Sequence, residues 1–172
     1  MLDFAVTGLG RCRTAWFAAF LSDGNVHCHH EFAKRCRTPA DLSSARVAGR
    51  VTGIADTLVW LADEIPAKRV VVIHRDPAFA ERFVERTTGA KVDLSVADEA
   101  LWKVKGLHVF FDELDERMGE LVWILTGYDM RPERFELFKA MKIELLDPMA
   151  EQVPLSSYWE ERLCRHFSSS AA

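Results

Sequence analysis

A glycine-rich turn within residues 4–17 (FAVTGLGRCRTAWF) constrains the fold more than any other stretch of this chain. Phe4 to Val6 predict a short buried strand, and the apolar residues from Ala15 onward recur at helical spacing. Strand, glycine turn and helix in this order direct backbone N–H groups and a helix N-terminus at one point, where an anion such as phosphate binds. Arg11 and Arg13 strengthen this prediction because guanidinium groups match phosphate oxygens.

The rest of the chain alternates between strand-like and helix-like segments. Apolar runs at 70–73 and 108–111 predict strands buried in a parallel sheet, and residues 26–28 predict a shorter strand. Helices are expected at about 50–65, after Pro77, and at 93–105, 113–126, 132–141 and 156–167. This alternation predicts a three-layer α/β fold with a mostly parallel central sheet. We expect one domain over residues 1–167 and a frayed tail over 168–172.

Composition narrows the classes of partner and compartment. The 172 residues carry a net charge of −4, which argues against a general nucleic-acid binder, and no stretch is apolar for long enough to span a membrane. The four cysteines show no CxxC pairing, so we expect reduced thiols in a cytoplasmic protein. The cluster His27-Cys28-His29-His30 is compatible with zinc, but no second ligand pair follows at standard spacing, and we expect no metal.

Three polar segments follow predicted strands: Gly8–Thr14, His29–Glu31 and His74–Asp76. Because ligands of open parallel sheets bind at the carboxyl ends of the strands, we expect these segments to converge on one site. The polar region 33–50 is a candidate lid or acceptor loop, since Pro39 interrupts any long helix there.

The loop does not match the common nucleotide-binding patterns. Aligned with GxxxxGK[ST] from Gly8, it has Arg13 for the second glycine, Thr14 for the lysine and Ala15 for the Mg²⁺-binding hydroxyl, which disfavours a Mg-ATP enzyme. The dinucleotide pattern GxGxxG also fails, because Arg13 stands at its third glycine.

Three motifs in sequence order resemble those of the sulfotransferase family. TGLGRCRTAWF resembles its 5′-phosphosulfate loop, VVVIHRDPAFAERF its strand followed by Arg-Asp-Pro, and HVFFDEL with LTGYDMRPERF its late strand and helix. The resemblance spans about residues 3–145. It implies a P-loop NTPase-like fold that binds 3′-phosphoadenosine 5′-phosphosulfate (PAPS) or the bisphosphate product PAP, with no obligatory metal, and transfers the sulfuryl group to a hydroxyl acceptor.

The resemblance also implies roles for individual residues. Arg11 falls on the basic residue that contacts the 5′-phosphate and assists the leaving group, Thr14 on a phosphate-binding threonine and Arg75 on the arginine that holds the 3′-phosphate. Glu31 resembles the catalytic base of the tyrosylprotein branch, and His30 or His29 is an alternative base. The loop positions that would surround the donor phosphate are Gly8, Gly10, Arg11, Cys12, Arg13, Thr14 and Ala15.

Departures from the family pattern keep other hypotheses open. Gly10, Cys12, Arg13 and Ala15 replace the residues that the family usually has, which is compatible with a non-catalytic phosphonucleotide-binding or interaction module on the same fold. A diverged P-loop kinase is a weaker alternative. Cys12, in an electropositive turn, is a candidate either for a reactive thiol of low pKa or, equally, for a purely structural residue. The sequence pattern specifies neither the acceptor nor the oligomeric state.

Overall fold

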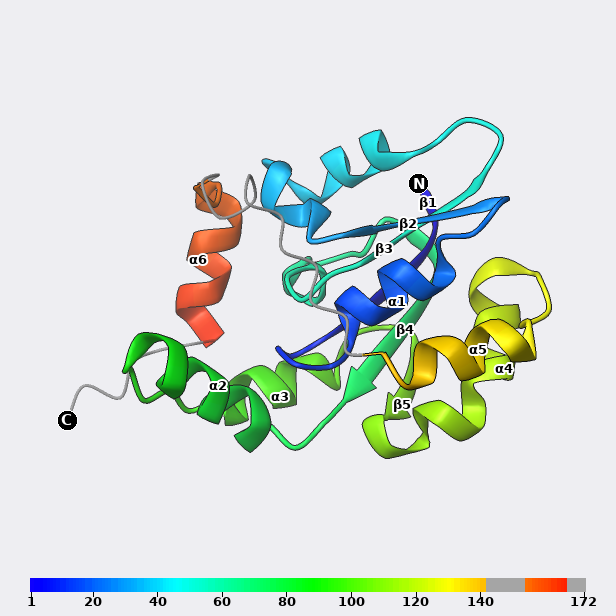
Figure 1. Cartoon of the computed structure of the whole chain (residues 1–172). Coiled ribbons are helices and arrows are strands. Elements are labelled where there is room, and N and C mark those ends of the chain that lie inside the picture. Colours follow the sequence, from blue (N-terminus) through cyan, green and yellow to red (C-terminus); the bar gives the residue numbers. More distant parts are fainter. Residues whose placement is uncertain (142–153, 167–172) are drawn as a thin grey trace.

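The structure, a computed structural model, describes residues 1–141 and 154–166 of the chain. Within them, five strands form one sheet in the order β2-β3-β1-β4-β5, and every neighbouring pair is parallel (Figure 1). The strands are β1 (Leu2–Gly8), β2 (Val26–His30), β3 (Val51–Ala55), β4 (Ala67–His74) and β5 (Leu107–Phe110). The predicted α/β fold with a parallel central sheet is confirmed, and β1, which leads into the glycine loop, is its central strand.

Helices cover both faces of the sheet. One face packs against α1 (Thr14–Leu21), α4 (Leu114–Thr126) and α5 (Pro132–Lys139), and the other against α2 (Ala78–Thr88), α3 (Ser95–Leu101) and α6 (Ser157–His166) (Figure 1). Four short 3-10 helices connect these elements: η1 (Phe32–Arg35), η2 (Pro39–Ala45), η3 (Val59–Leu61) and η4 (Phe111–Glu113). None of the described helices has the length and apolar character needed to cross a bilayer.

Apolar side chains of the strands alternate between two cores, which is why the runs at 4–6 and 70–73 form strands. Phe4 and Ile73 are fully buried on the face of α1 and α4, whereas Ala5 and Val72 are fully buried on the opposite face. Both faces of the central strands are therefore dry. The polar groups needed for binding must come from the loops at the strand ends.

The prediction of a helix at about 50–65 is wrong. Residues 51–55 form β3, and only the short η3 follows. The helical spacing of Ile54, Leu58 and Leu61 arises because all three pack into the same core from a strand and the turn after it. Gly53 allows β3 to lie directly beside β1. A Cβ at Gly53 would lie 2.2 Å from a ring carbon of Phe4, so only the glycine backbone fits against that ring.

The helix predicted at 156–167 is present as α6, while the expected frayed tail at 168–172 lies outside the described residues. Trp159 of α6 is fully buried, and its indole N–H donates to the carbonyl of Cys36 at 2.9 Å. Ser156, just before the helix, donates to the carbonyl of Arg37. Part of the region 33–50, the candidate lid or acceptor loop, thus forms the 3-10 helices η1 and η2, and α6 contacts the connection between them.

We expect Trp159→Ala to lower the free energy of unfolding by about 3–5 kcal/mol, because it leaves a cavity and an unpaired carbonyl. Trp123→Ala is the matched control, since Trp123 is 60% exposed on α4 and its loss should change stability by less than about 0.5 kcal/mol. Urea unfolding followed by circular dichroism measures both. Equal losses in the two variants would contradict the described packing of α6.

Candidate functional site

Three segments meet at the carboxyl end of the sheet, around the loop between β1 and α1. The Thr14 hydroxyl lies 3.5 Å from Nε2 of His30, the last residue of β2. Arg75, which directly follows β4, donates from Nη1 to the carbonyl oxygen of Arg11 at 2.7 Å. The predicted convergence of these strand ends is therefore confirmed.

Two loop residues adopt a backbone conformation that residues other than glycine usually avoid. The angle φ is 70° at Arg11 and 65° at Arg13, in the left-handed region, which costs roughly 1–2 kcal/mol for an L-residue with a side chain. Glu31, with φ of 51°, is the only other such non-glycine residue in the described part of the chain. Strained backbone of this kind concentrates at functional sites. All three are residues that the sequence assigns to the site.

Arg75 supports the loop from the side of β4. Its guanidinium lies over the rings of Phe79 and Phe111, 4.0 Å from each centroid. The exposed Arg11 side chain lies near Phe83, 4.9 Å from the ring centroid. Burial, and then the charge of Arg11, lower the pKa of Arg75. Guanidinium groups gathered in this way create a positive potential that a bound anion would relieve.

The side chain of Arg13 is engaged with α4. Its Nη1 donates to Oδ1 of Asp115 at 2.8 Å, and its guanidinium lies 5.1 Å from the Phe111 ring centroid. This ion pair keeps the bulky side chain beside α4. Arg13 therefore shapes the loop through its left-handed backbone. Its guanidinium charge lies on the α4 side of the loop. Sequence reasoning missed Asp115, which is 102 residues further along the chain.

The two glycines of the loop differ in what they require. A Cβ at Gly8 would lie 2.5 Å from the carbonyl oxygen of Ile73 and 2.9 Å from Sγ of Cys12, so no side chain fits there. A Cβ at Gly10 would meet only the Cβ of Ala80 at 3.9 Å, an ordinary contact distance. Gly8 is thus required by packing against β4, whereas the surroundings of Gly10 leave room for a methyl group.

Cys12 lies beneath the loop and is 1% exposed. Burial raises the pKa of its thiol to about 12, so the interpretation of Cys12 as a reactive thiol of low pKa is wrong. Its side chain fills the space beside Gly8. Thr14, the first residue of α1, is also buried, and Ala15 beside it is half-buried. The charge at the loop surface therefore comes from the arginines.

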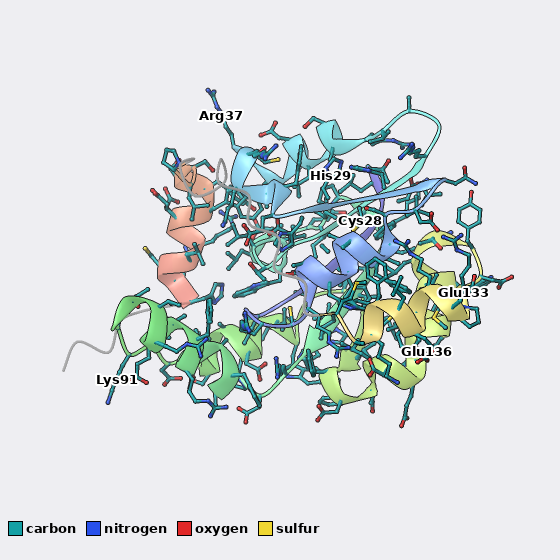
Figure 2. The ribbon with its side chains drawn as sticks, in the orientation of Figure 1. Cys28, His29, Arg37, Lys91, Glu133 and Glu136 are labelled. Carbon is teal, nitrogen blue, oxygen red and sulfur yellow. The ribbon has the colours of Figure 1, made fainter. Side chains whose placement is uncertain are left out.

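The candidate bases lie at the end of β2. The Glu31 carboxylate accepts a hydrogen bond from Nζ of Lys34 at 2.7 Å. His30 is beside Thr14, on the loop side of β2. His29, labelled in Figure 2, belongs to the opposite face, where its Nε2 lies 2.8 Å from the carbonyl oxygen of Ala45, and burial lowers its pKa. The geometry therefore leaves Glu31 and His30 as candidates and directs His29 away from the loop.

Asp56 directly follows β3 and is 1% exposed. It was not identified from the sequence, because the helix predicted at 50–65 includes this residue. Its Oδ2 accepts from the backbone N–H of Ala33 at 2.9 Å, and its Oδ1 from that of Leu58 at 2.8 Å. The available signal was an acidic residue directly after 51–55, a short segment that contains three β-branched residues. Among the described residues Asp56 is a fully buried carboxylate, and it is hydrogen-bonded to the segment that carries Glu31.

Other charged groups lie away from this cluster. Arg37 and Lys91 extend into solvent at the periphery of the molecule, and Glu133 and Glu136 lie on α5 (Figure 2). Within residues 1–141 and 154–166, no group of three or more His, Cys, Asp or Glu side chains is arranged to hold a metal ion. No protein-family model matches the chain, and no curated protein matches it significantly.

We expect Gly8→Ala to destabilise the fold by about 1–3 kcal/mol, because the added methyl group must displace the backbone of β4. Gly10→Ala is the control and should stay within about 0.5 kcal/mol of the parent chain. Thermal unfolding of the two variants provides the comparison. A Gly10→Ala variant as unstable as Gly8→Ala would show that the loop is packed differently from this structure.

Proposed function

We propose that this chain binds PAPS, or PAP after reaction, at the β1–α1 loop and transfers the sulfuryl group to a hydroxyl acceptor. The observation that carries the proposal is the loop itself: left-handed Arg11 and Arg13 with the guanidinium of Arg75 against the same backbone. Alternating backbone conformations of this kind turn successive N–H groups toward one anion. In this proposal the 5′-phosphate lies at the loop, between its N–H groups and Arg11.

Arg75 is the proposed ligand of the 3′-phosphate. A guanidinium has five N–H donors, and the bond to the carbonyl of Arg11 occupies one of them. The rings of Phe79 and Phe111 restrict its side chain, and such restriction lowers the entropy lost when a phosphate binds. Arg75 is therefore suited both to support the loop and to pair with a second phosphate.

In the proposed reaction, side chains and loop N–H groups carry out the proton transfer and the charge stabilisation. Glu31 accepts the proton of the acceptor hydroxyl, the oxygen forms a bond to sulfur, and the bond between sulfur and the phosphate oxygen breaks. The leaving PAP carries the negative charge that Arg11 and the loop N–H groups stabilise. His30, beside Thr14, is the alternative proton acceptor. The four free cysteines support a reducing compartment, the cytoplasm, for this reaction.

One observation favours a second candidate, a phosphonucleotide-binding module without catalysis. The Glu31 carboxylate is already paired with Lys34, so its Oε2 is engaged by a partner within the chain before any acceptor binds. The third candidate, a Mg-nucleotide kinase, is opposed by Ala15 in place of the metal-binding hydroxyl.

We expect PAP to bind the chain in the presence of EDTA, and Arg11→Ala or Arg75→Ala to weaken binding by about 10- to 100-fold, as expected when a charge-assisted hydrogen bond is lost. Arg50→Ala is the control, because Arg50 is exposed and precedes β3, at the opposite end of the sheet. Isothermal titration calorimetry measures the affinities. Binding of Mg-ATP alone, or PAP binding unaffected by Arg11→Ala, would contradict the proposal.

Catalysis is tested separately by the release of PAP from PAPS with a panel of phenolic and carbohydrate acceptors. Glu31→Gln should reduce turnover by about 100-fold or more if Glu31 is the base, while leaving PAP affinity unchanged. Glu136→Gln is the control, since Glu136 is exposed on α5 (Figure 2). PAP binding with no turnover in the parent chain would favour the non-catalytic module.

A further inference from the structure

Asp56 joins two parts of the candidate site that are far apart in the sequence. Its backbone N–H donates to the carbonyl of Val6 at 2.9 Å, and its own carbonyl accepts from the Thr7 hydroxyl at 2.8 Å. Val6 and Thr7 directly precede the glycine loop. The carboxylate of the same residue accepts from the N–H of Ala33, two residues after Glu31. One buried residue therefore contacts both the strand that leads into the loop and the segment that carries the candidate base.

The bond to Ala33 has a specific consequence for Glu31. His30 pairs with Ala55 in the sheet, so the chain on both sides of Glu31 is fixed: by the strand before it and by the Asp56 carboxylate after it. Between these two points Glu31 adopts a φ of 51°. A left-handed residue persists only when its surroundings determine it, because an extended conformation is otherwise more stable. The carboxylate of Asp56 supplies that restraint.

We propose that Asp56 is a positioning residue, whose carboxylate sets the place of Glu31 relative to the phosphate loop through the backbone N–H of Ala33. This inference rests on the proposed function only for the role of Glu31 as the base. The structural connection between Asp56, Ala33 and the end of β1 stands independently of the substrate. In this proposal Asp56 takes no direct part in the transfer, since its side chain is 1% exposed and each carboxylate oxygen accepts from a backbone N–H.

The charge of Asp56 is sensitive to pH near neutrality. Burial, and to a smaller extent the charge of Glu31, raise its pKa to about 6, whereas the backbone N–H groups of Leu58 and Ala33 and the charge of Lys34 act in the opposite direction. The other titratable groups that interact with Asp56 are the buried thiols of Cys12 and Cys36, whose pKa values are raised to about 12 and about 11. Protonation of Asp56 replaces one acceptor oxygen with a hydroxyl and weakens the restraint on Glu31.

The first test follows the backbone amide resonances of Ala33 and Leu58 by ¹⁵N NMR as pH is varied. Both should shift with a common midpoint near pH 6 in the parent chain, because they share one carboxylate, and neither should do so in Asp56→Asn. Asp41→Asn is the matched control, since Asp41 accepts from the backbone N–H of Thr38 but on the exposed surface. Amides of Ala33 and Leu58 that share no common midpoint at any pH at which the chain stays folded would overturn the inference, and this measurement on the parent chain needs no variant to fold.

The second test separates positioning from donor binding. Asp56→Asn should keep the PAP affinity within about twofold but lower PAPS turnover by about 100-fold, since small displacements of a reacting group have effects of that size. The turnover of the parent chain should also rise with pH around 6, and Asp56→Asn should lack that step. Unchanged turnover in a folded Asp56→Asn variant would overturn the inference. Failure of the parent chain to bind PAP would instead refute the proposed function. The positioning role of Asp56 would then be tested by the NMR titration alone.

Discussion

The site depends on a strained backbone that is held in place by charged side chains. Arg11 and Arg13 occupy the left-handed region, and each is restrained by one contact from a distant segment: the Arg75 guanidinium on the carbonyl of Arg11, and Asp115 on the side chain of Arg13. Together the two residues store roughly 2–4 kcal/mol of strain. A loop preorganised in this way does not have to rearrange when an anion binds, so its dipoles and charges act at full strength.

The parallel sheet explains why these contacts can form. All five strands end at the same edge, which brings together segments that follow β1, β2, β3 and β4, although they are spread over residues 8–76. The two faces of the sheet are filled by apolar side chains, and Phe111, which packs against one of these cores, also lies against Arg75. A rigid, dry core thus supports a small charged surface at one end.

The same arrangement divides the site into two halves. Arg11 and Arg75 lie on the side of β1 and β4, and the Glu31 segment lies at the end of β2. Asp56 connects the halves from the strand between them. This division suits a group transfer in which one half holds the donor and the other receives a proton from the acceptor. It also suits a binding module in which only the first half is used.

Local sequence patterns predicted the parts of the site that depend on neighbours in the chain. The glycine loop, the strand at 70–73 and the polar residues at strand ends are of this kind. The helix expected at 50–65 failed because packing of Gly53 against Phe4, a contact between strands, overrides the spacing of apolar residues. Asp115 was missed because its role is set by a contact with a distant segment, which leaves no periodic signal. Asp56 was missed because the predicted helix covered it, although it directly follows a strand.

The most direct test of the central claim, a preorganised loop for a phosphate, is an experimental structure with PAP bound. The account predicts a phosphate against the backbone N–H groups of residues 10–14, near the guanidinium groups of Arg11 and Arg75, with φ at Arg11 and Arg13 still positive. A phosphate bound elsewhere on the molecule, or a loop in which these two residues have returned to negative φ, would contradict it.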